Sequence, residues 1–201
     1  MLRIVPVTLS TDRLVLRPLG LDDVPALARA ASDGDLWDKK TTTVPRPEDF
    51  EAYVRSALDQ QAAGSALPFA TVVRDSGTVV GSTRYMNIDR ANHRVEIGTT
   101  WIARSWQRTF VNTHAKFLML RHAFEDLDCN AVELRTHRLN DQSRAAIERL
   151  GATLDGILRR HMIMPDGHVR DTAVYSILRE EWPGVKAALE RRIAEAAPTV
   201  S

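Results

Sequence analysis

Cysteine is nearly absent from this sequence: Cys129 is the only one among 201 residues. A single cysteine cannot form an intramolecular disulfide, which indicates a reducing compartment. Its place between an expected helix and an expected strand favours a small buried apolar residue over a nucleophile. The sequence also lacks a signal-peptide core and any apolar run of ~18 residues, so we expect a cytoplasmic protein with no membrane partner.

Charge of one sign does not predominate either. The chain has 27 Lys and Arg against 26 Asp and Glu, a net charge of +1 with neutral histidine. Domains that bind nucleic acid usually show a basic excess or a basic stripe, so no nucleic acid is expected as a partner. The histidines show no spacing with Cys, Asp or Glu that is typical of metal ligands, and His114 and His122 lie too far apart to share one ion. We therefore expect no metal.

Glycine is missing from the segment between Ala103 and Thr113, which joins an expected strand over 94–102 to an amphipathic helix expected to begin near Thr113. Such a turn gathers unpaired backbone N–H groups at the positive end of the helix dipole, and these groups can bind a phosphate or pyrophosphate. Arg108, Thr109 and Thr113 add side-chain donors there. Without glycine, a positive φ is costly and the backbone approaches a phosphate less closely.

Hydrophobic periodicity predicts a mixed succession of strands and helices. The expected order is a strand over 11–18, helices from about 24 and over 48–63, strands over 68–74, 78–87 and 94–102, a helix from about 113, a strand over 131–137, a helix over 140–150, strands over 153–164 and 168–178, and a C-terminal helix over 180–196. Strands in mixed order around helix crossovers argue for an α/β or α+β fold, and the length fits one domain over residues 1–201.

Three details of the connections are expected. Asp22 or Asp23 can cap the first helix, because short polar side chains accept hydrogen bonds from the first helical N–H groups. The polar segment 33–47 reads as irregular, with Trp37 exposed among charges. The tripeptide Pro165-Asp166-Gly167 predicts the turn between the last two strands.

Four segments together have an order and spacing that are fairly specific, although each alone is a weak signal. They are Thr11–Pro18, Val95–Gly98, His122–Leu127 and the stretch from Asn140 to Ala152. In this order they resemble the opening strand, central strand, end of the cofactor-binding helix and later helix of the GNAT superfamily of N-acetyltransferases, in the branch that includes the RimJ and RimL ribosomal-protein acetyltransferases. The resemblance implies a mixed, mostly antiparallel central sheet flanked by helices.

The resemblance also implies that acetyl-CoA, or another acyl-CoA, is the co-substrate. Its pantetheine would pair with the backbone of the central strand near Trp101 and Ile102, and its pyrophosphate would lie on the following turn. The residues expected at that turn are Gln107, Arg108, Thr109, Phe110, Val111, Asn112 and Thr113. The family usually places at least one glycine here, and the turn of this chain looks one residue longer.

Candidate catalytic residues follow the same resemblance. Asn140 and Ser143 share a face at the start of one helix because they are separated by three positions. The resemblance implies that Asn140 contacts the cofactor and that Ser143 protonates the departing sulfur. The alternative is that Asn140 is an N-cap with Ser143 in the first helical turn. Capping and binding can coexist.

Glu96 is the candidate general base. It lies mid-strand beside apolar neighbours, where burial would raise the pKa of its carboxyl and allow it to take a proton from an amine, either directly or through water. The alternative is an edge or salt-bridged glutamate that pairs with Arg94 or Arg84. Tyr175, on the last strand, reads either as a core tyrosine or as a hydroxyl on the substrate side.

These residues predict an N-acyltransferase that works by direct transfer in a ternary complex. Its acceptor would be a small-molecule or peptide amine, and segment 33–47 either lines the acceptor side or is an ordinary solvated loop. The C-terminal helix and the strands over 153–178 suggest a homodimer. The alternative function is a catalytically silent acyl-CoA-binding sensor or interaction domain with the same fold.

Overall fold

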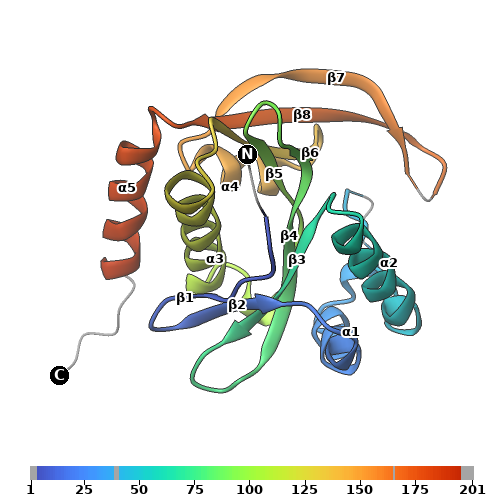
Figure 1. Ribbon diagram of the computed structural model, residues 1–201. Helices are drawn as coiled ribbons and strands as arrows, with labels where there is room; N and C mark the ends of the chain where they lie inside the picture. Colours follow the sequence, from blue (N-terminus) through green and yellow to red (C-terminus); the bar gives the residue numbers. More distant parts are fainter. Residues whose placement is uncertain (1–3, 39–40, 165, 196–201) are drawn as a thin grey trace.

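The computed structural model describes residues 4–38, 41–164 and 166–195 (Figure 1). Residues 39 and 40 of the expected irregular segment lie outside this part of the chain. So do Pro165 of the expected turn and Ala196 at the end of the expected C-terminal helix.

Within the described residues, eight strands form one sheet in the order β1-β2-β3-β4-β5-β6-β8-β7. The strands are β1 Leu9–Ser10, β2 Leu14–Pro18, β3 Leu67–Val73, β4 Val79–Asp89, β5 Arg94–Ile102, β6 Ala131–His137, β7 Thr153–Ile163 and β8 Val169–Leu178. Neighbouring strands are antiparallel except for β5 and β6, which are parallel. The expected mixed, mostly antiparallel sheet is therefore confirmed.

Helices cover both faces of the sheet. They are α1 Val24–Ser32, α2 Phe50–Ala62, α3 Phe110–Arg121, α4 Asp141–Glu148 and α5 Trp182–Glu195, and a π-helical turn over His122–Asp126 continues α3. Figure 1 shows α3, α4 and α5 on one side of the sheet and α1 and α2 on the other. The long β7–β8 hairpin extends beyond the sheet towards the side of α2.

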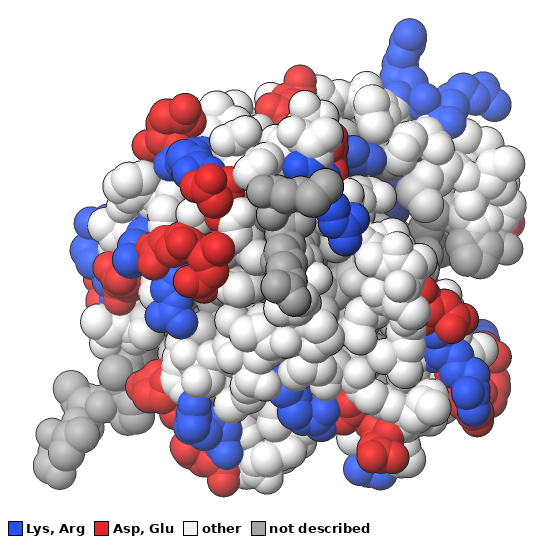
Figure 2. Space-filling model, viewed as in Figure 1, with Lys and Arg blue, Asp and Glu red and all other residues white. Residues whose placement is uncertain are grey.

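Each face of the sheet has its own apolar core. The larger core lies under α3 and α5, and the smaller one lies under α1 and α2. The opening strand shows how the sequence separates them: Leu14 and Leu16 enter the larger core, while Val15 between them packs against the smaller one. This follows from the two-residue period of a strand. Acidic and basic side chains are interspersed over much of the surface in Figure 2, with basic groups projecting at the β7–β8 end.

The structure corrects three local expectations. Helix α3 begins at Phe110 instead of near Thr113, because Thr109 is its N-cap and accepts a hydrogen bond from Val111 N at 3.4 Å. Trp37 is half-buried instead of exposed, because it packs against the smaller core. Asp23 occupies the N-cap position of α1, but its carboxylate accepts no capping hydrogen bond from this helix and is bound by Arg17 at 2.8 and 2.5 Å.

Candidate active site

The parallel strands β5 and β6 separate after a short paired stretch. Their register joins Arg94–Glu96 to Ala131–Glu133 and goes no further. Beyond Glu96, β5 continues to Ile102 beside β4, and β6 continues to His137 beside β8. Within the described chain, the β6-facing backbone edge of β5 from Ile97 onward has no strand partner, so an extended ligand can pair there.

The second half of β5 contains a bulge. Its register passes from Arg84↔Gly98 to Ser82↔Trp101, so two β5 residues, Thr99 and Thr100, oppose one residue of β4. Thr99 has a φ of +47°, in the left-handed region. A bulge takes its extra residue out of the strand ladder and re-aims the neighbouring groups. Backbone N–H groups at this point are therefore candidates to bind a developing oxyanion.

Both residues expected to pair with pantetheine lie on this separated stretch, but the side chain of Trp101 and the backbone carbonyl of Ile102 already have partners within the chain. Trp101 is buried in the smaller core, where its ring centroid lies 5.6 Å from that of Phe50. The carbonyl of Ile102 accepts a hydrogen bond from Gln107 Nε2 at 2.9 Å. Gln107 therefore fastens the turn to the end of β5, and its side-chain amide faces the strand.

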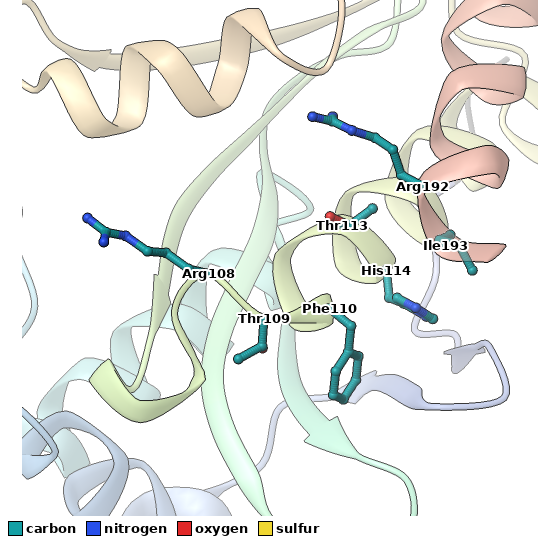
Figure 3. A pocket seen from close by; sticks show the side chains of 7 residues that line it. All are labelled: Arg108, Thr109, Phe110, Thr113, His114, Arg192 and Ile193. Carbon is teal, nitrogen blue, oxygen red and sulfur yellow. The ribbon is translucent and has the colours of Figure 1, made fainter. Parts of the chain in front are cut away.

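Arg108 provides the positive φ that the glycine-free turn requires. Its φ is +61°, and its side chain is exposed. The side chains of Arg108, Thr109, Phe110 and Thr113 line a cavity of about 260 Å³, which also involves His114 on α3 and Arg192 and Ile193 on α5 (Figure 3). In Figure 3, Arg108 and Arg192 lie on either side of Thr113. A cavity with two arginines in its lining therefore lies at the N-terminus of α3, where the phosphate site is expected.

The other residues of this segment divide between cavity and core. Val111 is buried in the larger core, whereas Asn112 and Thr113 are half-buried. The guanidinium carbon of Arg13 lies 3.8 Å from the ring centroid of Phe110. His114 is fully buried, and while its Nδ1 lies 2.8 Å from Thr11 Oγ1, its Nε2 has no partner in the described chain. Burial lowers the pKa of His114, so the ring is neutral near pH 7.

Glu96 lies on the face of β5 opposite the larger core, and it is 5% exposed. Asn87 Nδ2 donates to its Oε2 at 2.7 Å, and Arg135 Nε lies 3.3 Å from the same oxygen. Burial raises the pKa of Glu96, while the hydrogen bond from Asn87 and the charge of Arg135 act in the opposite direction. Glu96 is thus ion-paired, as one form of the alternative predicted, but the cation beside it is Arg135 and not Arg94 or Arg84.

Asn140 is the N-cap of α4, as the structural alternative predicted. Its Oδ1 accepts a hydrogen bond from Ser143 N at 3.0 Å. Helix α4 directly follows β6, so this cap holds the half-buried Ser143 at the end of the separated strand pair. The geometry leaves the Ser143 hydroxyl outside the capping bond, which uses only its backbone N–H.

Tyr175 is a core residue with an anchored hydroxyl. Its ring is buried, its hydroxyl donates to Glu148 Oε1 at 2.8 Å, and Arg144 Nε donates to it at 3.0 Å. Cys129 is also buried, and burial raises the pKa of its thiol to about 11. A thiol with this pKa is almost entirely protonated at neutral pH, which argues against a nucleophilic cysteine.

Several polar residues of the site were not expected from the sequence pattern. Asn87 and Arg135 bind Glu96, Lys116 reaches the bulge, and Arg192 comes from α5. Lys116 alone carries a local signal, because it lies within a run of buried, mostly apolar residues of α3. The described residues contain no group of three or more His, Cys, Asp or Glu side chains placed to hold a metal ion. Among the same residues, no helix is both long and apolar enough to span a membrane.

Comparison with known proteins identifies the family. The acetyltransferase (GNAT) domain family matches residues 13–153. An uncharacterised N-acetyltransferase of Bacillus licheniformis, p20, is 27% identical over 179 residues, which are 88% of this chain and 99% of p20. YdaF of Bacillus subtilis, provisionally named a ribosomal N-acetyltransferase, is 34% identical over 110 residues, which are 55% of this chain and 59% of YdaF.

Solved structures agree with this assignment. A GCN5-related N-acetyltransferase from Brucella melitensis is 30% identical and has a TM-score of 0.84, with 97% of this chain and 87% of that one covered. RimJ of Mycobacterium smegmatis, solved in complex with CoA-disulfide, shares the fold at 24% identity with a TM-score of 0.78, covering 94% of this chain and 95% of RimJ. The chain belongs to the GNAT acetyltransferase family. This membership confirms the resemblance and supports acyl transfer from CoA.

Proposed function

We propose that this protein is an N-acetyltransferase that moves an acetyl group, or another acyl group, directly from acyl-CoA to an amine in a ternary complex. The proposal rests on one observation, which is that three features occur together on β5. These are the separation from β6, the bulge at Thr99 and Thr100, and the buried carboxylate of Glu96 on the same strand. They provide a free backbone edge along which acyl-CoA can bind, backbone N–H groups at the bulge, and a proton acceptor.

The co-substrate would bind along β5 and end at α3. Pantetheine would pair with the backbone near Trp101 and Ile102, and the pyrophosphate would lie at the cavity formed by the start of α3. Arg108, Thr113 and the backbone N–H groups from Phe110 to Thr113 are the proposed donors. That the fold can accept CoA is supported by RimJ, which was solved with CoA-disulfide.

In the proposed reaction, acyl-CoA supplies a thioester carbonyl, and the residues of this chain handle the protons. Glu96, through water, takes a proton from the acceptor amine as its nitrogen forms a bond to the carbonyl carbon. Backbone N–H groups at the bulge stabilise the oxyanion, and Ser143 donates a proton to the sulfur when the carbon–sulfur bond breaks. The buried Cys129 takes no part, so the transfer needs no covalent enzyme intermediate.

The remaining features of the proposal concern setting and assembly. The acceptor would be a peptide or small-molecule amine, a choice supported by the ribosomal N-acetyltransferase name of YdaF. Residues 1–201 would act as one acyltransferase unit in the cytoplasm.

A homodimer is supported by the last strand of the sheet, β7, which carries exposed Leu154, Leu158 and Ile163. Light scattering coupled to size-exclusion chromatography measures its mass.

The turn at Arg108 favours a second candidate, a catalytically silent acyl-CoA sensor. A non-glycine residue at φ +61° holds the backbone in a costly conformation, which would weaken the pyrophosphate site. Thermal unfolding with millimolar CoA and acetyl-CoA tests the binding that both candidates share. Saturating ligand must raise stability, by about 2.7 kcal/mol at a hundredfold excess over Kd. Absence of any shift rejects both candidates.

Thiol release then separates the enzyme from the sensor. The protein is incubated with acetyl-CoA and a panel of small amines and peptides, and free CoA thiol is measured over time. An enzyme shows amine-dependent thiol release that Glu96→Gln abolishes, whereas a sensor binds the ligand and releases none above the rate without protein. The Glu96→Gln variant must retain the CoA-induced thermal shift for this comparison to be valid.

A further inference from the structure

Arg84 is a buried residue whose hydrogen-bonding capacity is largely unused. It lies in β4 and is 5% exposed. Its Nη1 donates to Gln60 Oε1 at 3.2 Å, and its guanidinium carbon lies 5.1 Å from the ring centroid of Tyr53. Nε and Nη2 are buried and have no hydrogen-bond partner in the described chain. A buried cation without a carboxylate partner is destabilising, which points to a ligand that completes the site.

The two unused nitrogens form one side of the guanidinium fork. Nε–H and one N–H of Nη2 are parallel, and this pair matches the two oxygens of a carboxylate. The partner on the remaining side is the neutral amide oxygen of Gln60, an exposed residue near the end of α2. The protein therefore leaves free the geometry that binds a carboxylate through two hydrogen bonds.

Arg84 lies on the same face of the sheet as the proposed base. The β4–β5 register pairs Arg84 with Gly98 and Met86 with Glu96. Arg84 and Glu96 are therefore diagonal neighbours, which in antiparallel strands lie about 7–8 Å apart. Gly98 has no side chain, and a Cβ placed there would lie 3.0 Å from Glu96 Oε1 and 2.5 Å from Met86 Sδ. The Glu96 carboxylate thus extends along β5 towards the residue that faces Arg84.

The two charged groups do not neutralise each other. Glu96 is bound by Asn87 and Arg135 through Oε2, and no ion pair joins it to Arg84 in the described residues. One face of β4 and β5 therefore carries a proton acceptor and, one diagonal step away, a buried guanidinium with two nitrogens that have no hydrogen-bond partner in the described chain. A ligand that carries an amine and a carboxylate is complementary to this arrangement.

We infer that Arg84 binds a carboxylate of the acceptor, and that the acceptor is an amine with this carboxylate close to its amino group. An amino acid fits this description, and so does a peptide with an acidic residue next to its N-terminus. The inference rests on the proposed function, because it takes Glu96 as the group that faces the amine. Arg84 would then select the acceptor, while the chemistry stays with Glu96 and the bulge.

Arg84→Met tests the inference, with Arg55→Met as a matched control. Both variants replace a guanidinium by an unbranched apolar side chain, but Arg55 is exposed on α2 and pairs with Glu51. Thiol release is measured with amino acids and their amides, and with peptides whose second residue is Asp or Asn. We expect Arg84→Met to lower kcat/KM about 10- to 100-fold for the carboxylate-bearing member of a pair, as for a lost hydrogen bond to a charged group, and to leave the amide unchanged.

The two sets of acceptors distinguish the sources of the carboxylate. Preference for free amino acids over their amides assigns a small acceptor, whereas preference for Asp over Asn peptides assigns a polypeptide. Calorimetric titration of the same compounds into CoA-saturated protein adds a readout without turnover, and Arg84→Met should weaken the binding of the carboxylate-bearing member of each pair by about 10- to 100-fold. Thermal unfolding of the ligand-free variant should give a Tm equal to or above that of the wild type, because a buried unpaired charge has been removed.

Two outcomes overturn the inference. One is wild-type protein that binds and uses each amide as well as its acid. The other is an Arg84→Met variant with a lower Tm and an unchanged acceptor preference, which assigns Arg84 a structural role. If the wild type acetylates no amine at all, the proposed function fails, and the calorimetric comparison still decides whether Arg84 binds carboxylates.

Discussion

Lys116 Nζ, in the middle of α3, donates a hydrogen bond to Thr100 Oγ1, 2.8 Å away in the bulge of β5. The Thr100 hydroxyl also shares a hydrogen bond with Thr83 Oγ1 at 2.7 Å. A chain of polar groups therefore crosses the sheet-facing side of α3 and reaches β4. Lys116 is 6% exposed, and burial lowers its pKa from 10.5 to about 7. The bulge thus has a buried amine beside it that titrates near neutral pH.

This pKa predicts an unusual pH dependence of stability. Between about pH 7 and 10.5, the unfolded chain keeps a proton on Lys116 that the folded chain has released. The unfolded state then binds more protons, so the destabilising effect of Lys116 is full below pH 7 and fades as the pH rises towards 10.5. Lys116→Met should therefore stabilise the protein more at pH 7 than at pH 9.5, by on the order of 3 kcal/mol.

Urea unfolding of the wild type and Lys116→Met at the two pH values measures this difference. Lys186→Met is the control, because Lys186 is partly exposed and pairs with Glu125 at 2.8 Å. Its effect on the free energy of unfolding should change little between pH 7 and 9.5. Equal effects of Lys116→Met at both pH values would show that the folded protein holds Lys116 with an ordinary pKa.

Arg108 combines a costly backbone conformation with a charge at the proposed phosphate site. Since its φ is +61°, glycine relieves the strain and alanine retains it. Arg108→Gly should therefore be more stable than Arg108→Ala by about 1 kcal/mol in urea unfolding. Both variants should bind CoA about tenfold more weakly by calorimetry, because each loses a charged donor. Unchanged or tighter binding by Arg108→Gly would assign the phosphate contact to the backbone alone.

The sequence predicted elements well where one local pattern decides them. Strand β5 was expected over 94–102 and occupies Arg94–Ile102, because Val95 and Ile97 alternate with charged residues in its first half and polar segments flank the strand. The start of α3 was misplaced because Thr109 was read as a phosphate donor, although threonine is also a favoured N-cap. Trp37 was misplaced because its charged neighbours in the sequence do not reveal the core beneath it.

Only part of the candidate site could be predicted from the sequence. Glu96 and Asn140 could be proposed from the sequence because each has a local signal, a carboxylate within an apolar strand and a cap residue before a helix. Their partners were not, since Asn87 and Arg135 reach Glu96 only through strand pairing. The separation of β5 from β6 is likewise a tertiary property, because the sequence of a strand does not show how far along its length a neighbouring strand stays paired with it.

Substitutions at Asn140 and Ser143 distinguish a capping role from a catalytic role. Asn140→Ala removes the oxygen that accepts from Ser143 N at 3.0 Å, so it should lower the free energy of unfolding by about 0.5–2 kcal/mol. Ser143→Ala keeps the backbone N–H and should change stability by less than about 0.5 kcal/mol. Its kcat should nevertheless fall while its affinity for CoA stays the same. Urea unfolding, thiol release and calorimetry measure the three quantities, and full turnover by Ser143→Ala would remove it as the acid.

If Glu96 is the base, kcat/KM should depend on pH, and two substitutions near Glu96 should shift this dependence in opposite directions. As a base it must be ionised, and burial raises its pKa, so the acidic limb of kcat/KM should lie above the ordinary value of 4.5. Asn87→Gly removes a hydrogen bond that lowers this pKa, and glycine suits the φ of +47° at that position, so the limb should move to higher pH. Glu133→Gln removes a negative charge that raises the pKa of Glu96, so the limb should move to lower pH. Glu96→Gln should lower kcat by about 10²- to 10⁴-fold and abolish the limb. An acidic limb that stays in place in both Asn87→Gly and Glu133→Gln would mean that the titrating base lies elsewhere.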